Sequence, residues 1–179
     1  MQVILITGLS GSGKSVVLKF LEDNGYYCVD NLPAEMLPQL IELLQEEGQS
    51  QVAVSIDARS GETLNDLPQH LTALKHTGID LRVMYLEAKT ETLVKRYSES
   101  RRRHPLSDGE RTLSECIELE RMLLDRVAET GHHIDTSDLS PAALSTWVKD
   151  FLALDRSRIT LLFESFGFKH GLPLDADFV

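Results

Sequence analysis

A glycine-rich segment near the start of the chain carries the residue types and spacing that point most directly to chemistry. Residues 8–15 read Gly-Leu-Ser-Gly-Ser-Gly-Lys-Ser and fit the phosphate-binding pattern G-x-x-x-x-G-K-[ST] at every fixed position. The glycines let the backbone approach a polyphosphate closely, with its N–H groups turned toward the anion. We therefore predict that a nucleoside triphosphate contacts Gly8, Leu9, Ser10, Gly11, Ser12, Gly13, Lys14 and Ser15.

The last two residues of this segment have separate expected roles. Lys14 would reach the β- and γ-phosphates, and the hydroxyl of Ser15 would be a ligand for Mg²⁺. The flanks suit such a loop, because residues 2–7 read as a buried strand and residues 15–23 read as a helix. A glycine-rich turn without a ligand is the alternative, and the strand, the helix and the Lys-Ser pair together argue against it.

Length, charge and cysteine content limit the class of protein to which this chain can belong. A chain of 179 residues suits one sizeable α/β domain with a small appendage. No apolar run approaches the roughly 20 residues of a membrane span, and the strand so close to Met1 leaves no room for a signal peptide. Cys28 and Cys116 form no metal or redox pair, which favours a reducing cytoplasm. The net charge of −10 disfavours nucleic acid overall, although a local basic patch could bind one.

Carboxylates follow the second and third predicted strands. The strand at residues 26–30 ends in Asp30, which either points into the ligand crevice of a doubly wound sheet or simply shapes a turn with Asn31. The strand at residues 51–57 ends in Asp57, where a Walker B carboxylate would stand. We predict that Asp57 holds Mg²⁺ through a water molecule or steadies the attacking water.

Two later strands also end in polar residues. A fourth strand at residues 79–86 leads to Glu87, which is the second candidate for the Walker B role. A fifth strand at residues 132–137 ends in Thr136 and Ser137, where folds of this kind often seat the nucleotide base. The intervening helices are predicted at 34–47 with an irregular first turn, at 61–77, from 90 to before 105, at 112–129 and at 140–154. We predict an α/β P-loop fold, a five-stranded parallel sheet with helices on both faces, like the small-molecule kinases.

The most basic stretch lies ahead of a loop that contains proline and glycine. It comprises Lys95, Arg96, Arg101, Arg102, Arg103 and His104. The pattern resembles the lid of small P-loop kinases, in which guanidinium groups close over the γ-phosphate and stabilise developing charge. We predict that Arg102 acts in this way. A solvated basic helix face and a patch for an acidic partner are the alternatives.

Four segments together resemble the bacterial RapZ (YvcJ) family of RNase adapter, P-loop nucleotide-binding proteins. They are residues 8–15, 25–33, 102–106 and 163–171. The resemblance implies ATP at residues 8–15 and a contact to GTP from the segment Asp57, Ala58, Arg59 and Ser60. It also implies ATPase and GTPase activity, assembly into a homo-oligomer, and an RNA-binding role in small-RNA decay with an RNase partner.

The chain departs from the family by ending at Val179. We predict a nucleotide-binding domain over residues 1–155 and, over residues 156–179, only the first strand and loop of a C-terminal domain. In the family, the basic RNA-binding tail and an expected aminosugar-phosphate sensor site lie in that missing domain. RNA and RNase contacts are therefore expected mainly in the full-length form. No Asn-Lys-x-Asp motif occurs, so we expect ATP ahead of GTP.

The leading functional hypothesis is a cytoplasmic regulatory adapter that binds ATP, and GTP as a second nucleotide, and hydrolyses them slowly. Lys14, Asp57 and Arg102 are its candidate catalytic residues, and Ser15 and Asp57 would hold Mg²⁺. The main alternative is a kinase of a small metabolite, with Asp30 as the base that accepts the proton of the acceptor hydroxyl. A binding module without hydrolysis is the third hypothesis.

Overall fold

The computed structural model describes residues 1–153 together with Gly167 and Lys169, and its centre is a parallel β-sheet. The five strands lie in the order β2-β3-β1-β4-β5, and every neighbouring pair is parallel. They are β1 (Gln2–Gly8), β2 (Tyr27–Val29), β3 (Gln51–Ser55), β4 (Asp80–Glu87) and β5 (His132–Asp135). The predicted fold class is confirmed.

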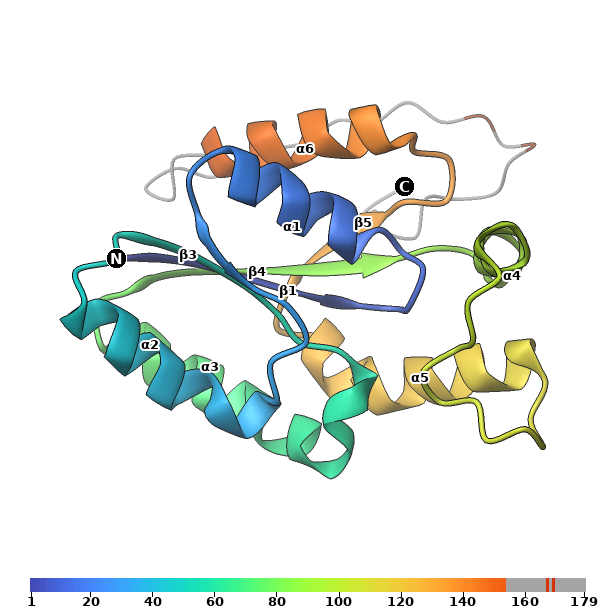
Figure 1. The fold of residues 1–179 in the computed structure, drawn as a ribbon, viewed down its shortest axis with the longest axis horizontal. Coiled ribbons are helices and arrows are strands. Elements are labelled where there is room, and N and C mark those ends of the chain that lie inside the picture. The colour runs from blue at the N-terminus through green and yellow to red at the C-terminus, as the bar shows by residue number, and fades with distance from the viewer. Residues whose placement is uncertain (154–166, 168, 170–179) are drawn as a thin grey trace.

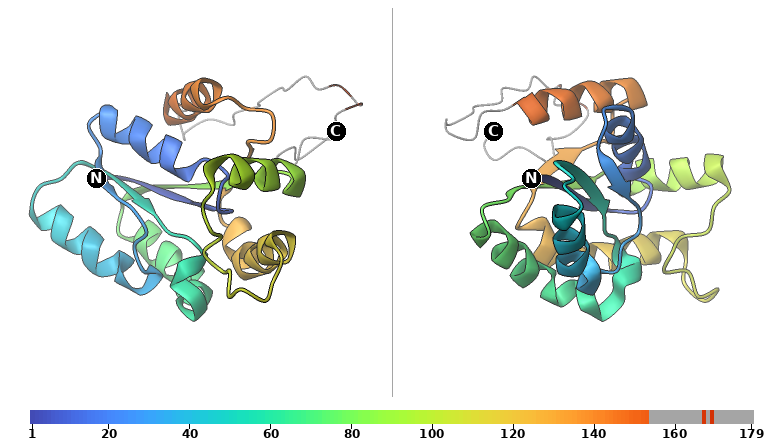
Figure 2. Two further views of the ribbon diagram at one scale, coloured as in Figure 1. Left: turned by 45° about the vertical axis from the view of Figure 1, so that its right-hand side comes forward. Right: turned by 60° about the vertical axis from the view of Figure 1, so that its left-hand side comes forward.

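Helices cover both faces of the sheet (Figure 1). One face carries α1 (Lys14–Asp23) and α6 (Pro141–Ala153), and the other carries α2 (Leu37–Glu46), α3 (Leu67–His76) and α5 (Leu113–Ala128). The views of Figure 2 place α4 (Thr90–Ser100) beyond the ends of β1 and β4, where it overhangs the edge of the sheet. Two 3₁₀ helices, η1 (Ala34–Met36) and η2 (Ala58–Asp66), precede α2 and α3.

The central strand β1 is buried on both faces, which explains its nearly continuous apolar sequence. Ile4 and Ile6 pack with α1 and α6, whereas Val3 and Leu5 pack with α2, α3 and α5. All four side chains are inaccessible to solvent. Because β1 lies between β3 and β4, the segment that follows it opens at the middle of the sheet's carboxyl edge, where α/β sheets bind ligands.

Two predicted helices have a different local structure. The helix predicted over residues 61–77 is instead η2 followed by α3, because Gly61 has a non-helical backbone (φ 58°, ψ −131°) and Pro68 stands in the first turn of α3. The helix predicted over 34–47 begins with η1, in agreement with its predicted irregular first turn. The strand predicted near residues 159–168 lies outside the described residues. Within the described part of the chain, no helix has the length and hydropathy to cross a bilayer.

Arg82 on β4 joins the sheet to the end of α6. Its Nη1 donates to the carbonyl oxygens of Phe151 and Leu152, both at 3.0 Å, and its guanidinium pairs with Asp80 at 3.3 Å. The last carbonyl groups of a helix have no intrahelical donor. The Arg82 side chain, which is only 11% exposed, therefore supplies the donors that these carbonyls need.

We expect Arg82→Met to destabilise the domain, because methionine keeps an apolar stem but leaves both carbonyl groups without this donor. The expected loss is about 1–3 kcal/mol in the free energy of unfolding, measured by urea denaturation. Lys19→Ala is the matched control, since Lys19 makes only exposed ion pairs with Glu22 and Asp23 on α1. Equal urea midpoints for wild type and Arg82→Met would contradict this account of α6.

Candidate nucleotide-binding site

The phosphate loop, residues 9–13, leaves β1 at a point where only glycine fits. Gly8 has a φ of 125°, and a Cβ atom there would lie 1.9 Å from the carbonyl oxygen of Leu86 on β4. The next residue continues this close approach, because the N–H of Leu9 donates to the same oxygen at 2.9 Å. The loop therefore starts directly against the neighbouring strand, and the pattern's first glycine is a steric requirement.

Side chains from several elements hold the carbonyl groups of this loop. The ammonium of Lys14 donates to the oxygens of Gly8 and Leu9 at 2.7 and 3.2 Å. Arg96 on α4 donates to the carbonyl oxygen of Gly11 at 3.0 Å. The hydroxyl of Thr136 donates to the carbonyl oxygen of Ser12 at 2.8 Å. The first N–H groups of α1 have no acceptor within the helix, and they form the positive end that favours an anion.

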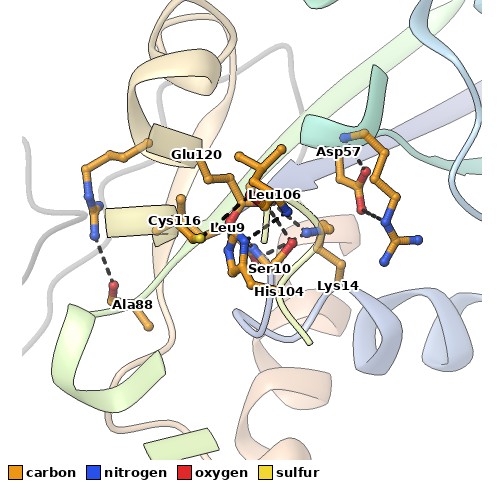
Figure 3. A network of polar contacts seen from close by, with 12 residues as sticks. Leu9, Ser10, Lys14, Asp57, Ala88, His104, Leu106, Cys116 and Glu120 are labelled. Atoms are coloured by element: carbon orange, nitrogen blue, oxygen red, sulfur yellow. Dashed lines mark hydrogen bonds and ion pairs between the residues drawn. The ribbon is translucent and has the colours of Figure 1, made fainter. Parts of the chain in front are cut away.

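The amide of Ser10 has a different partner, the carboxylate of Glu120 on α5 (Figure 3). Glu120 accepts from the Ser10 N–H at 2.8 Å and from the Ser10 hydroxyl at 2.7 Å, and its Oε2 lies 3.1 Å from Nε2 of His104. Its side chain is completely buried. Burial alone would raise the pKa of Glu120, but the hydrogen bonds from His104 and Ser10 and the charge of Lys14 hold this pKa below its usual value.

A cavity of about 400 Å³ opens in front of the phosphate loop. Three groups of residues line it. The loop and α1 contribute Ser10, Gly11, Gly13, Lys14 and Ser15; the segments that follow β2 and β3 contribute Asp30, Asn31, Asp57 and Arg59; and α4 with the loop after it contributes Arg96, Tyr97, Ser100, Arg102, Arg103 and Pro105. The fold thus brings Lys14, Ser15, Asp57 and Arg102, predicted from three separate patterns, to one cavity.

Asp57 stands at the wall of this cavity and is only 4% exposed. Its Oδ1 accepts from the N–H of Arg59 at 3.0 Å, which caps η2, and its Oδ2 lies 3.8 Å from Nε of Arg59. Ser55 precedes it on β3 and is paired in register with Ile6, so its hydroxyl faces the α1 side of the sheet. That hydroxyl is buried and has no hydrogen-bond partner among the described residues.

These oxygen atoms fit a hydrated Mg²⁺ ion, which prefers hard oxygen ligands and keeps several water molecules. The hydroxyl of Ser15 lines the same cavity as Asp57, and Oδ2 of Asp57 is not used in capping η2. Burial lowers the pKa of the Lys14 ammonium below its usual value, and the negative charges of Glu120 and Asp57 oppose this shift. Of the segment predicted to contact GTP, Asp57 and Arg59 line the cavity, whereas Ala58 is buried behind them.

Other predicted residues lie elsewhere. Glu87, the second Walker B candidate, is not among the residues that line the cavity; it pairs with Arg121 and with His133, each at 3.1 Å. Thr136 does not present a surface for a base, because it is 1% exposed and its hydroxyl is bonded to the backbone of Ser12 and of Glu87. Thr136, the residue after β5, instead supports the phosphate loop.

Glu120 was missed by the sequence analysis, although the sequence holds a signal for it. The buried residues of α5 include Cys116, Ile117, Glu120, Leu124 and Val127. Glu120 therefore occupies a position on the apolar stripe of an amphipathic helix. A carboxylate on such a stripe requires buried partners, and it is a reason to search for a functional site.

We expect Gly8→Ala to destabilise the domain far more than Gly48→Ala. Both glycines have a positive φ, 125° at Gly8 and 77° at Gly48, so an added Cβ costs about 1–3 kcal/mol of backbone strain at either position. Only Gly8 adds a clash with backbone, since nothing lies within 4 Å of a Cβ placed on Gly48. Urea denaturation of the two variants isolates the clash, and equal losses would contradict the described start of the loop.

Comparisons with known proteins agree with this architecture. Residues 1–156 match the family described as the RapZ-like N-terminal domain. A protein of Thiobacillus denitrificans named "Nucleotide-binding protein" is 62% identical over 179 residues, which cover 100% of this chain and 64% of that relative. A protein of the same name from Chromobacterium violaceum is 58% identical with the same coverage. The chain thus spans about 64% of the length of these curated relatives.

Solved structures of distant proteins share the fold. A shikimate kinase from Acinetobacter baumannii superposes with a TM-score of 0.57 at 18% identity, covering 85% of this chain and 93% of that protein. A tunicamycin resistance protein of Deinococcus radiodurans gives a TM-score of 0.58 at 18% identity, covering 86% and 96%. At these identities the likeness concerns the fold alone. Because the family match extends over residues 1–156, the chain belongs to the RapZ-like N-terminal domain family.

Proposed function

We propose that this domain binds the polyphosphate of Mg²⁺-ATP on its phosphate loop. The observation that carries the proposal is the loop itself, whose carbonyl groups are held by Lys14, Arg96 and Thr136 while the N-terminus of α1 faces the cavity. The names of the two relatives, which describe nucleotide-binding proteins, support it.

The cavity residues have complementary roles in this proposal. Lys14 would leave one of its loop carbonyl groups to bind the β- and γ-phosphates, and Ser15 and Asp57 would hold Mg²⁺, directly and through water respectively. The metal would neutralise phosphate charge. Arg102 is exposed and lines the cavity from the opposite side, so its guanidinium can bind charge that develops on the γ-phosphate. Slow hydrolysis, with Asp57 orienting water, is the activity that this set supports best.

ATP and GTP would share one site. The segment that the family resemblance connects with GTP lies in the same cavity as the phosphate loop, since Asp57 and Arg59 line it beside Lys14 and Ser15. Two triphosphates would place their charges together in a cavity of about 400 Å³. We therefore propose competition between the two nucleotides, with ATP preferred because no Asn-Lys-x-Asp motif is present.

A kinase of a small metabolite is the second candidate function. The observation in its favour is that Asp30 and Asn31, at the end of β2, line the cavity together with Lys14. An acceptor hydroxyl bound between Asp30 and the γ-phosphate would lose its proton to that carboxylate. Release of ADP separates the two functions, because a kinase is accelerated many-fold by its acceptor whereas an adapter hydrolyses slowly without one.

The proposal for the whole protein extends beyond this domain. We propose that residues 1–155 form the nucleotide-binding domain and that residues 156–179 begin a second domain. Nucleotide binding would regulate a cytoplasmic, homo-oligomeric adapter that binds RNA and an RNase through the remaining part of the full-length protein. A short structured RNA titrated into this chain tests the division, since we expect it to bind weakly compared with nucleotide.

We expect Lys14→Ala to remove measurable binding of Mg²⁺-ATP without unfolding the domain. The substitution deletes the ammonium that would contact the phosphates, and charge-assisted hydrogen bonds of this kind make large contributions to affinity. Calorimetric titration measures the affinity, and circular dichroism checks the fold. Lys19→Ala is the matched control, because Lys19 is an exposed lysine on the same helix. Unchanged affinity in Lys14→Ala would refute the phosphate-loop assignment.

We further expect GTP to displace bound ATP competitively, with one nucleotide per chain at saturation. Displacement of a fluorescent ATP analogue by GTP measures the competition, and calorimetry gives the stoichiometry. Arg59→Ala should weaken both nucleotides, and Arg126→Ala on the exposed surface of α5 should weaken neither. Simultaneous binding of ATP and GTP would show that the segment at residues 57–60 belongs to a separate site.

A further inference from the structure

A buried carboxylate on α5 connects the phosphate loop to the segment that follows α4. Glu120 binds Ser10 of the loop through two hydrogen bonds and His104 of that segment through a third, as Figure 3 shows. The side chains of Glu120 and His104 are 0% and 1% exposed. Within the described chain, this pair therefore makes a direct and solvent-free link between two walls of the cavity.

The hydrogen bonds of His104 define its tautomer. Its Nδ1 accepts from the N–H of Leu106 at 3.2 Å, so this nitrogen carries no proton. The proton must then be on Nε2, which donates to Oε2 of Glu120 at 3.1 Å. Both ring nitrogens are thus used, and the imidazole is fixed at one end by α5 and at the other by its own loop. The thiol of Cys116 on α5 also donates to the oxygen of Leu106, at 3.7 Å.

His104 ends the short segment that carries the lid arginines. Arg101 closes α4 with a left-handed backbone (φ 52°), Arg102 and Arg103 are exposed and line the cavity, and His104 is buried. The two arginines therefore stand between two fixed points, the end of α4 and the imidazole of His104. Among the described residues, no backbone hydrogen bond outside the helices and strands joins Arg102 or Arg103 to the phosphate loop, so His104 is the second fixed point of this segment.

The packing of Tyr97 strengthens this link. Its ring lies 5.4 Å from the ring of His104, centroid to centroid. On its other side it covers the phosphate loop, because a Cβ on Gly11 would meet the Tyr97 ring at 3.4 Å. Burial raises the pKa of Tyr97 to about 12, so its hydroxyl remains neutral beside Glu120. The loop, α4 and His104 consequently form one packed unit.

We propose that Glu120 and His104 form a latch, which couples the phosphate loop to the lid segment 101–106 and positions Arg102 and Arg103 over the bound polyphosphate. The two latch residues are positioning residues, since neither lines the cavity as a ligand contact. The inference rests on the proposed nucleotide site. Binding of an anion to the phosphate loop would change the arrangement of the lid segment 101–106 through Ser10, Glu120 and His104, and the arrangement of this segment would in turn change anion binding.

The first test is amide hydrogen exchange of the wild-type chain with and without Mg²⁺-ATP. The latch requires that nucleotide slow exchange both at residues 8–15 and at residues 101–106. Protection of residues 8–15 without any change at 101–106 would overturn the latch while leaving nucleotide binding intact. Failure to bind nucleotide at all would be seen separately, as the absence of protection at residues 8–15.

The second test uses trypsin, which cleaves after the exposed arginines of the lid. We expect His104→Ala to be cut after Arg101, Arg102 or Arg103 at least about tenfold faster than wild type without nucleotide, because one fixed end of the segment is released. In this variant Mg²⁺-ATP should no longer slow the cleavage, although it still binds. His76→Ala is the control, since His76 is an exposed histidine at the end of α3. Mass spectrometry identifies the cut sites.

A conservative variant separates positioning from general loss of structure. In His104→Gln the side-chain amide can still donate to Glu120, so it should restore most of the nucleotide-dependent protection. Cleavage of His104→Ala at the wild-type rate, with the same protection by nucleotide, would overturn the proposal. The proposal also fails if His104→Gln and His104→Ala behave alike while both retain the wild-type urea midpoint. If His104→Ala does not fold, the exchange experiment on wild type and the His104→Gln variant still decide.

Discussion

The structure depends on one constraint, which is that a phosphate loop must keep its shape when no phosphate is present. A loop that turns its N–H groups toward an anion leaves its carbonyl groups pointing the other way, and buried carbonyl groups need donors. Here most of the donors are side chains, from Lys14 within the loop's own helix, from Arg96 on α4 and from Thr136 after β5, and the N–H of Ser12 also donates to the oxygen of Leu9. The elements around the loop are arranged so that each reaches a different carbonyl group.

This requirement accounts for the position of Arg96 on α4. Arg96 is half-buried; burial lowers the pKa of its guanidinium, while the charges of Asp135 and Glu99 raise it. It remains charged, because the guanidinium group is protonated in proteins under all ordinary conditions. Its second nitrogen donates to the carbonyl oxygen of Thr136 at 2.6 Å, so one side chain connects α4, the loop and the end of β5. The supports of the loop are therefore coupled to each other as well as to the loop.

The sequence predicted the parts of the fold that depend on local pattern. The glycine spacing, the apolar run of β1 and the helix start at residue 112 are properties of short segments, and all appear in the structure, where Thr112 and Glu115 form a capping box before α5. For the site, the useful rule was that residues after the carboxyl ends of parallel strands converge at one edge of the sheet. In the structure, Asp30 and Asp57 line the same cavity as Lys14. Glu87 illustrates the limit of that rule: it also ends a strand, but its neighbours Arg121 and His133 pair with it outside the cavity.

The remaining part could not be predicted because it depends on which helix packs behind the loop. Ser10 and Glu120 are 110 residues apart, and nothing near either residue specifies the other.

The pairing of Ser10 with Glu120 also has an electrostatic consequence. A polyphosphate bound as proposed above would be repelled by this buried carboxylate, so Glu120 would oppose the affinity that Lys14 and the N-terminus of α1 would provide. A loop built only for tight binding would have no reason to contain that charge. Its presence is better explained by the three donors it accepts, from the N–H and hydroxyl of Ser10 and the imidazole of His104. A glutamine at this position would have one acceptor oxygen, which accepts at most two hydrogen bonds. Its NH₂ group would face the third donor unless the Ser10 hydroxyl turned to accept from it. In the proposed latch, Glu120 would thus lower the affinity for phosphate and would fix the connection between the phosphate loop and the lid segment 101–106.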